Sequence, residues 1–133
     1  MKKLNCIVVF DKEKEKILFC KRMKDPYKGL YNFVGGKVEE KETDLEAAYR
    51  ELSEETGITN QEIELFPLMD FTYYQQDFIL QIYVGKLQNE VTLVEEKNPL
   101  IWLTLDEDFC NPKRFAGDRN IGHIVNVALK YLL

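Results

Sequence analysis

The hydrophobic positions of the chain fall into short segments that predict β-strands. Residues 4–10 and 17–23 are rich in apolar and β-branched side chains, and the charged stretch DKEKEK separates them. This arrangement is typical of a β-hairpin with a solvated turn. Apolar residues that alternate with polar ones, or that form a short run, predict further strands at residues 32–34, 62–71, 77–87 and 100–105.

Two other segments have the signals of helices. Residues 45–56 contain strong helix formers and follow Thr43 and Asp44, either of which can cap a helix. Gly57 stands where a C-terminal cap belongs. The rest of the chain predicts an amphipathic helix over residues 120–133 and a short helical turn over residues 106–112. Strands before and after one central helix favour an α/β (α+β) fold, with a mixed sheet and helices on its faces.

Composition narrows the class of protein. A chain of 133 residues can bury its own core, so residues 1–133 are expected to form a single domain. The net charge of −5 provides no basic surface for a nucleic acid polymer, and no apolar stretch is long enough to span a membrane. Three scattered cysteines without a Cys-x-x-Cys pair are typical of reduced thiols, which predicts a cytoplasmic protein. A phosphate-bearing ligand would need local cations, either a metal ion or an arginine.

The predicted helix 45–56 carries an unusual set of carboxylates. With 100° per residue, Glu54 lies about 60° to one side of Glu51 and Glu55 about 40° to the other, so all three share one stripe. The face expected to pack inward consists of Leu45, Tyr49, Leu52 and Thr56. A solvated acidic face would have the same pattern, because exposed like charges repel weakly. A bound divalent cation would instead turn the repulsion into affinity, since Mg²⁺ and Mn²⁺ prefer carboxylate oxygens.

A longer motif distinguishes these two interpretations. Gly36 is followed after five residues by Glu42, and after seven more by the run RELSEETGI from Arg50 to Ile58. This is the pattern G-x5-E-x7-R-E-U-x-E-E-x-G-U, in which U is a bulky aliphatic residue, and every specified position is present. The chain therefore resembles the Nudix hydrolases, whose box corresponds to residues 36–58. The leading hairpin, the Gly-Gly entry, a late Trp and a C-terminal helix are similar to small MutT-type members.

The resemblance implies an α/β/α sandwich that holds a catalytic loop–helix–loop. It also implies hydrolysis of a pyrophosphate bond in a nucleoside diphosphate linked to a further group. Mg²⁺ or Mn²⁺ is the implied cofactor, and the partner is a small nucleotide rather than a nucleic acid or a membrane. Relatives of this kind are commonly monomers or homodimers.

The resemblance also assigns roles within the box. Glu54 and Glu55 resemble the principal metal-binding glutamates, and Glu51 resembles a further ligand or the group that orients or deprotonates the attacking water. The carbonyl of Gly35 resembles a backbone metal ligand, and Arg50 resembles the arginine that orients the catalytic glutamate. Glu42 then has a structural role or supports the loop.

Outside the box the resemblance suggests several charged contacts. MutT-type enzymes often take one more metal ligand from a loop, and counting back from Trp102 favours Glu96 over Glu95. Arg22 resembles the arginine that contacts substrate phosphate, although a solvated arginine at a strand end would look the same. Lys37 is a candidate for compensating phosphate charge or a plain surface lysine.

Contacts with the base are predicted separately. An Asn before the last helix contacts the purine edge in MutT-type enzymes, and Asn120 or Asp118 could serve here. Both residues also suit a helix N-cap, which is the favoured interpretation. Phe33, Tyr73 and Tyr74 could stack on a base, with core or cross-strand packing as the alternative.

The short chain favours a MutT-type enzyme that cleaves a (d)NTP, or an oxidised one such as 8-oxo-dGTP, to the monophosphate and pyrophosphate. Family members that act on diadenosine polyphosphates tend to carry a Tyr about 15 residues past the box, and Tyr73 and Tyr74 stand there. Hydrolysis of a diadenosine polyphosphate, or of a nucleotide sugar, is therefore the alternative. The stretch TYYQQ lacks the Pro that ADP-ribose hydrolases of the family carry there. From another class, a non-catalytic nucleotide-binding module would retain the fold, but it would not need the three box glutamates.

Overall fold

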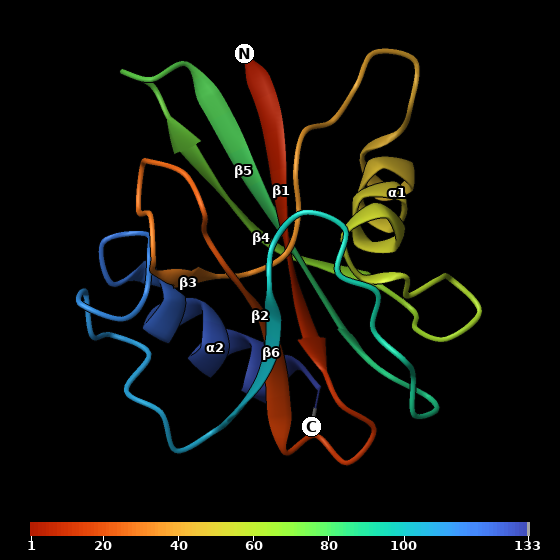
Figure 1. Cartoon of the computed structure of the whole chain (residues 1–133). Helices are drawn as coiled ribbons and strands as arrows, with labels where there is room; N and C mark the ends of the chain where they lie inside the picture. The colour runs from red at the N-terminus through yellow and green to blue at the C-terminus, as the bar shows by residue number, and fades with distance from the viewer. Residues whose placement is uncertain (133) are drawn as a thin grey trace.

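Strand β1 (Lys2–Phe10) lies at the centre of a six-stranded mixed sheet in the computed structural model, which describes residues 1–132 (Figure 1). The strand order is β3-β2-β1-β5-β4, and β6 also pairs with β2, outside this linear order. Only β1 and β5 run parallel, while the other pairs are antiparallel. The remaining elements are β2 (Lys16–Lys21), β3 (Tyr31–Asn32), α1 (Asp44–Thr56), β4 (Phe66–Tyr73), β5 (Phe78–Lys86), β6 (Leu100–Thr104) and α2 (Asn120–Tyr131).

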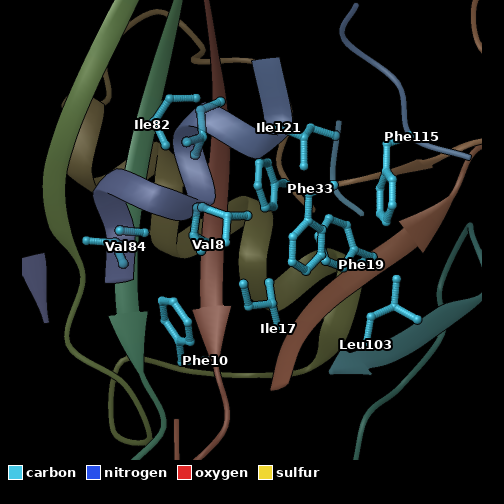
Figure 2. Packing of buried hydrophobic residues seen from close by; sticks show 14 residues of the cluster. Val8, Phe10, Ile17, Phe19, Phe33, Ile82, Val84, Leu103, Phe115 and Ile121 are labelled. Carbon is cyan, nitrogen blue, oxygen red and sulfur yellow. The ribbon is translucent and has the colours of Figure 1, made fainter. Parts of the chain in front are cut away.

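The two helices cover opposite faces of this sheet, as the sequence predicted. Successive side chains of a strand point to opposite faces, so β1 contributes to two cores. Val8 and Phe10 pack beneath α2, whereas Ile7 and Val9 pack beneath α1. Figure 2 shows the first core, in which α2 passes over the side chains of β1 and β5. The α/β (α+β) fold class is confirmed.

An aromatic group closes one side of the core beneath α2. The ring of Phe19 lies 5.1 Å from that of Phe33, 5.7 Å from that of Phe109 and 5.3 Å from that of Phe115 (centroid distances). Offset and tilted rings at these separations attract one another in addition to burying apolar area. Phe33 is therefore held rigidly directly after β3, two residues before the Gly-Gly pair.

Helix α1 begins and ends at the predicted caps. The Thr43 hydroxyl accepts a hydrogen bond from the N–H of Glu46, and the Glu46 carboxylate accepts one from the N–H of Thr43. Gly57 closes the helix in the left-handed conformation with φ of 80°, and its N–H donates to the carbonyl of Ser53. These local signals explain why the helix bounds could be predicted closely.

The inward face of α1 differs from the prediction at its start. Leu45 is exposed and Tyr49 is partly buried, whereas Ala47 and Ala48 are fully buried beside Leu52. The two small alanines let the helix approach the sheet closely, and the buried stripe is centred on them. This orientation also turns Glu51 inward, so that the helix presents a carboxylate to the glycine turn.

Three other predicted elements need correction. The strand predicted over residues 62–71 begins only at Phe66, because residue 63 makes a single isolated bridge to Leu87 and a β-bulge separates Pro67 from Met69. Residues 106–112 form turns, with no helical turn. The last helix ends at Tyr131, and Leu133, the predicted end, lies outside the described residues.

Two further observations bear on the class of protein. Cys6, Cys20 and Cys110 are free, and Cys110 is exposed. Neither helix within residues 1–132 has the length and hydropathy needed to cross a membrane.

Candidate active site

The Gly35-Gly36 turn is fixed against the start of β1. Residues 34–38 return antiparallel along this half of the strand, with bridges from Ile7 to Val34 and from Leu4 to Lys37. Gly35 has φ of 150°, and a Cβ there would lie 2.1 Å from the carbonyl oxygen of Asn5. Only glycine permits this backbone approach.

Asn5 ties Gly36 in place through two hydrogen bonds. Its backbone N–H donates to the carbonyl of Gly36 at 2.7 Å, and its Oδ1 accepts from the N–H of Gly36 at 2.9 Å. The side chain is almost completely buried, with 2% of its surface exposed. The role of this residue was not predicted from the sequence, although Asn5 is a polar residue within an apolar first strand.

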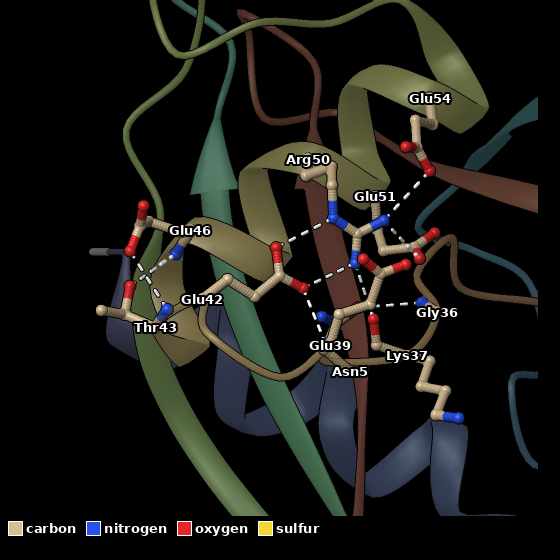
Figure 3. A network of polar contacts seen from close by, with 10 residues as sticks. All are labelled: Asn5, Gly36, Lys37, Glu39, Glu42, Thr43, Glu46, Arg50, Glu51 and Glu54. Carbon is tan, nitrogen blue, oxygen red and sulfur yellow. Dashed lines mark hydrogen bonds and ion pairs between the residues drawn. The ribbon is translucent and has the colours of Figure 1, made fainter.

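Arg50 joins the glycine turn to α1. Its Nε and Nη2 donate to the two carboxylate oxygens of Glu42 at 2.9 and 2.7 Å, and Nη2 also donates to the carbonyl of Lys37 at 2.8 Å. Its Nη1 donates to Glu51 at 3.0 Å and to Glu54 at 3.1 Å (Figure 3). One guanidinium thus fixes the loop and two glutamates together, using the fork geometry that lysine lacks.

The three glutamates of the stripe differ in environment. Glu51 is buried, whereas the side chain of Glu54 is 52% exposed. Glu55 is partly buried, and burial followed by the nearby charge of Glu51 raises its pKa from 4.5 to about 7. The amide of Gly35 and the cations of Lys97 and Arg22 oppose this rise in pKa. The three carboxylates therefore occupy one side of α1 at different depths.

The donor chemistry of this stripe fits a hard divalent cation. Carboxylate oxygens and a nearby backbone carbonyl are the ligands that Mg²⁺ prefers. The pKa of Glu55 is raised by burial and by the nearby charge of Glu51, and a bound cation would oppose both effects. Within residues 1–132, however, no three acidic, His or Cys side chains converge closely enough to hold a metal ion. In this structure Glu51 and Glu54 both accept a hydrogen bond from Nη1 of Arg50.

A pocket of about 470 Å³ opens beside the glycine turn. One end is polar and is lined by Gly35, Gly36, Glu55 and Arg22. The other end lies between the sheet and the start of α2. It is formed by aromatic, aliphatic and amide side chains, which include Phe33, Tyr73, Phe78, Leu80, Asn120 and Ile121. A carboxylate and a cation thus share one cavity with an apolar, amide-bearing recess.

The structure brings some predicted site residues to this pocket. Arg22 lines its polar end, and its Nε donates to the carbonyl of Pro26 at 2.7 Å. Phe33 forms part of the apolar wall, although it is 4% exposed and stacks on Phe19. Phe33 is thus itself part of the core, as the packing alternative predicted.

Other predicted residues lie elsewhere. Glu96 is exposed on the 89–99 connector and does not line the pocket, whereas Asn98 of the same connector does. Glu95 accepts a hydrogen bond from the N–H of Leu100 at 2.7 Å. The side chain of Lys37 is exposed and lines a separate hollow, while its backbone carbonyl accepts a hydrogen bond from Arg50.

The predicted capping role of Asn120 or Asp118 is wrong. The N-cap of α2 is Arg119, in a left-handed conformation with φ of 77°, and it makes no side-chain cap bond. Asn120 is the first helical residue, and its Nδ2 donates to the hydroxyl of Tyr73 at 3.4 Å. Asp118 accepts from the hydroxyl of Tyr27 at 3.2 Å. Both side chains line the pocket instead of closing the helix.

The clamp between Glu42 and Arg50 should make stability depend on pH. The hydrogen bond from Arg50 lowers the pKa of Glu42 from 4.5 to about 2. Its stabilising contribution is therefore complete above pH 4.5 and is lost as the pH falls toward 2. Glu42→Gln should lower the free energy of unfolding at pH 7, and the difference from wild type should shrink between pH 5 and 3.

Urea denaturation at several pH values measures this difference. Glu40→Gln is the matched control, because Glu40 is an exposed carboxylate of the same loop and has no hydrogen-bond partner among the described residues. A Glu42→Gln deficit that stayed constant from pH 7 to 3 would contradict the assignment.

Comparison with known proteins agrees with this geometry. The family described as NUDIX domain matches residues 2–121. The 8-oxo-dGTP diphosphatase of Escherichia coli (strain K12) is 31% identical over 107 residues, which are 79% of this chain and 83% of the enzyme.

Solved structures share the fold. One from a study of MutT from Aliivibrio salmonicida and Vibrio cholerae has a TM-score of 0.70 at 23% identity, covering 97% of this chain and 98% of its own. An Ap4A hydrolase of C. elegans has a TM-score of 0.78 at 16% identity, covering 99% of this chain and 98% of its own. The complete box, its arrangement around Arg50 and these matches show that the chain belongs to the Nudix family and is a pyrophosphohydrolase.

Proposed function

We propose that this protein hydrolyses nucleoside triphosphates, with an oxidised dNTP such as 8-oxo-dGTP as the favoured substrate, to the monophosphate and pyrophosphate. The observation that carries the proposal is the continuity of the pocket. Its polar end contains Glu55, Arg22 and the glycine turn, and its other end is an apolar recess with amide groups. A nucleotide has its groups in the same order, with charged phosphates at one end and a flat base that forms hydrogen bonds at the other. Similarity to the Escherichia coli 8-oxo-dGTP diphosphatase supports this substrate class.

Mg²⁺ is the proposed cofactor, held by Glu51, Glu54, Glu55 and the carbonyl of Gly35. When bound, it would neutralise phosphate charge and lower the pKa of a bound water. Glu96 is proposed as a further ligand only if the exposed 89–99 connector moves inward, because its side chain does not reach the pocket in this structure. Mn²⁺ would suit the same oxygen donors.

The protein's own groups would then perform three tasks. Arg22 would compensate phosphate charge. Lys37 would do the same if its loop moved toward the substrate. Arg50 would hold Glu51 and Glu54 in one orientation, so that a carboxylate of the stripe can accept the proton of the attacking water. Water attack at phosphorus then releases pyrophosphate from the nucleoside monophosphate.

Base recognition is proposed for the recess between the sheet and α2. Phe33 provides a rigid apolar wall, and the amide of Asn120 can hydrogen-bond to a purine edge. The existing bond from Asn120 to Tyr73 is long, at 3.4 Å, so a ligand can replace it at small cost.

A second substrate class has one specific observation in its favour. Tyr73 lines the pocket and stacks on Phe78 at 4.6 Å, which would suit the second base of a diadenosine polyphosphate. Tyr74 is 80% exposed and lies outside the pocket lining. One tyrosine of the predicted pair is therefore available for this role.

A substrate panel with Mg²⁺ tests the proposal. It should contain the canonical dNTPs, 8-oxo-dGTP, ADP-ribose, a nucleotide sugar and diadenosine polyphosphates, with kcat/KM measured for each. The highest kcat/KM is expected for 8-oxo-dGTP or another dNTP. A higher value for the dinucleotides would move the assignment to the alternative class. Absence of turnover throughout the panel, with nucleotide binding retained, would indicate a non-catalytic nucleotide-binding module.

A further inference from the structure

Two loops that are far apart in the sequence are joined at the rim of the pocket. The hydroxyl of Tyr27 donates a hydrogen bond to Oδ2 of Asp118 at 3.2 Å, across 91 positions of the chain. Both side chains line the pocket, yet both residues are exposed to solvent. Phe33 and Ile121, which line the pocket more deeply, are almost completely buried. The hydrogen bond between Tyr27 and Asp118 therefore crosses the mouth of the pocket.

The Tyr27 side of this bond is connected to the polar end of the pocket. Nε of Arg22 donates to the carbonyl of Pro26 at 2.7 Å. The backbone of Arg22 also exchanges hydrogen bonds with Gly29 and Leu30, at 2.7 and 2.9 Å. The loop over residues 22–30 is thus folded around the arginine that lines the pocket. A movement of Tyr27 would therefore disturb the position of Arg22.

The Asp118 side of the bond is connected to the recess. Asp118 stands two residues before Asn120, whose amide donates to the hydroxyl of Tyr73 at 3.4 Å. The turn before α2 consists of three left-handed residues, with φ of 81° at Gly117, 52° at Asp118 and 77° at Arg119. This conformation is unfavourable for residues other than glycine, so the turn depends on contacts with the rest of the structure. The hydrogen bond across the mouth is one such contact.

The direction of this hydrogen bond is fixed at neutral pH. Burial, followed by the charge of Asp118 and the hydrogen bond to it, raises the pKa of the Tyr27 hydroxyl above its usual value of 10. The hydroxyl therefore remains protonated and donates, while the carboxylate can only accept.

We propose that Tyr27 and Asp118 are positioning residues whose hydrogen bond holds the two ends of the nucleotide pocket at a fixed separation. This inference rests on the proposed nucleotide function and adds two residues that act on affinity rather than on the chemical step. A nucleotide that spans the pocket has its phosphates near Arg22 and its base in the recess. Loops that are already held in place lose less conformational entropy when such a ligand binds, which raises the affinity.

The effect of Tyr27→Phe should be measured in three backgrounds, which are wild type, Asp118→Asn and Asp118→Ala. Phenylalanine keeps the ring and removes the donor. Asparagine keeps an oxygen that can accept from Tyr27 and alanine does not, whereas both remove the negative charge. Comparison of the backgrounds therefore separates the hydrogen bond from the charge. Tyr74→Phe is the matched control, because Tyr74 is 80% exposed and lies outside the pocket lining.

Calorimetric titration with dGMP in the presence of Mg²⁺ gives the dissociation constant of each variant. Tyr27→Phe is expected to weaken dGMP binding about fivefold in wild type and in Asp118→Asn, which is the factor that one net hydrogen bond contributes. In Asp118→Ala the same substitution should change the affinity less than about twofold, because the acceptor is already absent. Tyr74→Phe should bind dGMP like wild type.

Turnover and stability distinguish a positioning role from a loss of structure. With the best substrate of the panel, Tyr27→Phe should raise KM about fivefold and change kcat less than about twofold, because neither residue contacts the carboxylate stripe. The melting temperature should stay within about 3 °C of wild type, because an exposed hydrogen bond contributes little to stability.

Three results would overturn the inference. Wild-type affinity and KM in Tyr27→Phe would show that the bond does not contribute to binding. An equal loss of affinity in the Asp118→Ala background would show that the hydroxyl acts without Asp118. A lower kcat with unchanged KM would place Tyr27 in the chemical step. Each of these results leaves the proposed function intact, whereas a wild-type protein that neither bound dGMP nor hydrolysed any nucleotide of the panel would remove both.

Discussion

Glu54→Gln is expected to lower kcat for Mg²⁺-dependent hydrolysis at least about a thousandfold, which corresponds to about 4 kcal/mol of transition-state stabilisation. The substitution keeps the size of the side chain and removes the charge that a divalent cation would bind. Glu54 is 52% exposed and its ion pair with Arg50 is a surface pair. Loss of that pair should cost at most about 1 kcal/mol of folding stability.

The two effects can be measured on the same protein. Thermal unfolding should show a folded variant, while pyrophosphate release shows the loss of turnover. Glu40→Gln makes the same charge change on an exposed carboxylate outside the pocket and should retain wild-type kcat. Wild-type turnover in Glu54→Gln would remove the carboxylate stripe from the mechanism.

The two glycines before the helix should respond differently to the same added methyl group. A Cβ on Gly35 would lie 2.1 Å from the backbone oxygen of Asn5, which cannot move without disturbing the pairing of β1 with β5. Gly35→Ala should therefore lower the free energy of unfolding by about 3 kcal/mol or more. The melting temperature should fall by about 10 °C or more.

Gly36→Ala should leave the fold in place and remove activity. Its Cβ would lie 2.3 Å from Cδ of Glu51, the far end of a flexible side chain that can swing away. Displacing a reacting group by about 1 Å can cost about a hundredfold in rate, so kcat should fall by at least that factor.

Gly29→Ala is the control for both glycine variants. Gly29 has a left-handed φ of 86° but nothing within 4 Å of the added Cβ, so the variant should lose only about 1 kcal/mol and keep its activity. Equal melting temperatures for Gly35→Ala and Gly29→Ala would show that the glycine turn does not lie as close to β1 as the structure indicates. Wild-type kcat in Gly36→Ala would show that Glu51 does not act from this position.

The clustering of like charges on α1 has a physical explanation in the structure. Arg50 compensates Glu51 and Glu54 with one nitrogen and Glu42 with the other two. Glu55 makes no ion pair with an arginine within residues 1–132, and burial together with the charge of Glu51 raises its pKa to about 7. The pocket therefore contains a carboxyl group that is only partly ionised near pH 7, and a bound cation would favour its ionised form.

Features that depend on neighbouring residues could be predicted from the sequence. The capping box at Thr43, the left-handed Gly57 and the spacing of the glutamates are local signals, and each appears in the structure as expected. The mixed sheet followed from the order of strands and helices. The Nudix box identified the family because its positions are fixed by one loop and one helix.

Features that depend on distant contacts could not be predicted in the same way. Leu45 is exposed because the sheet meets α1 at Ala47 and Ala48. A helical wheel gives no information on where the sheet lies relative to the helix. Asn120 looked like a cap, yet the chain enters α2 through a left-handed Arg119 and directs the amide toward Tyr73. Asn5 became recognisable only when Gly36, 31 residues away, was seen to bond to it twice.

Identification of the products of 8-oxo-dGTP hydrolysis, by ion-exchange chromatography with and without a chelator, tests the central claim most directly. The proposed function predicts 8-oxo-dGMP and pyrophosphate in equal amounts when Mg²⁺ is present, and no product when EDTA removes it. Release of orthophosphate and the nucleoside diphosphate, or turnover that persists in EDTA, would contradict it.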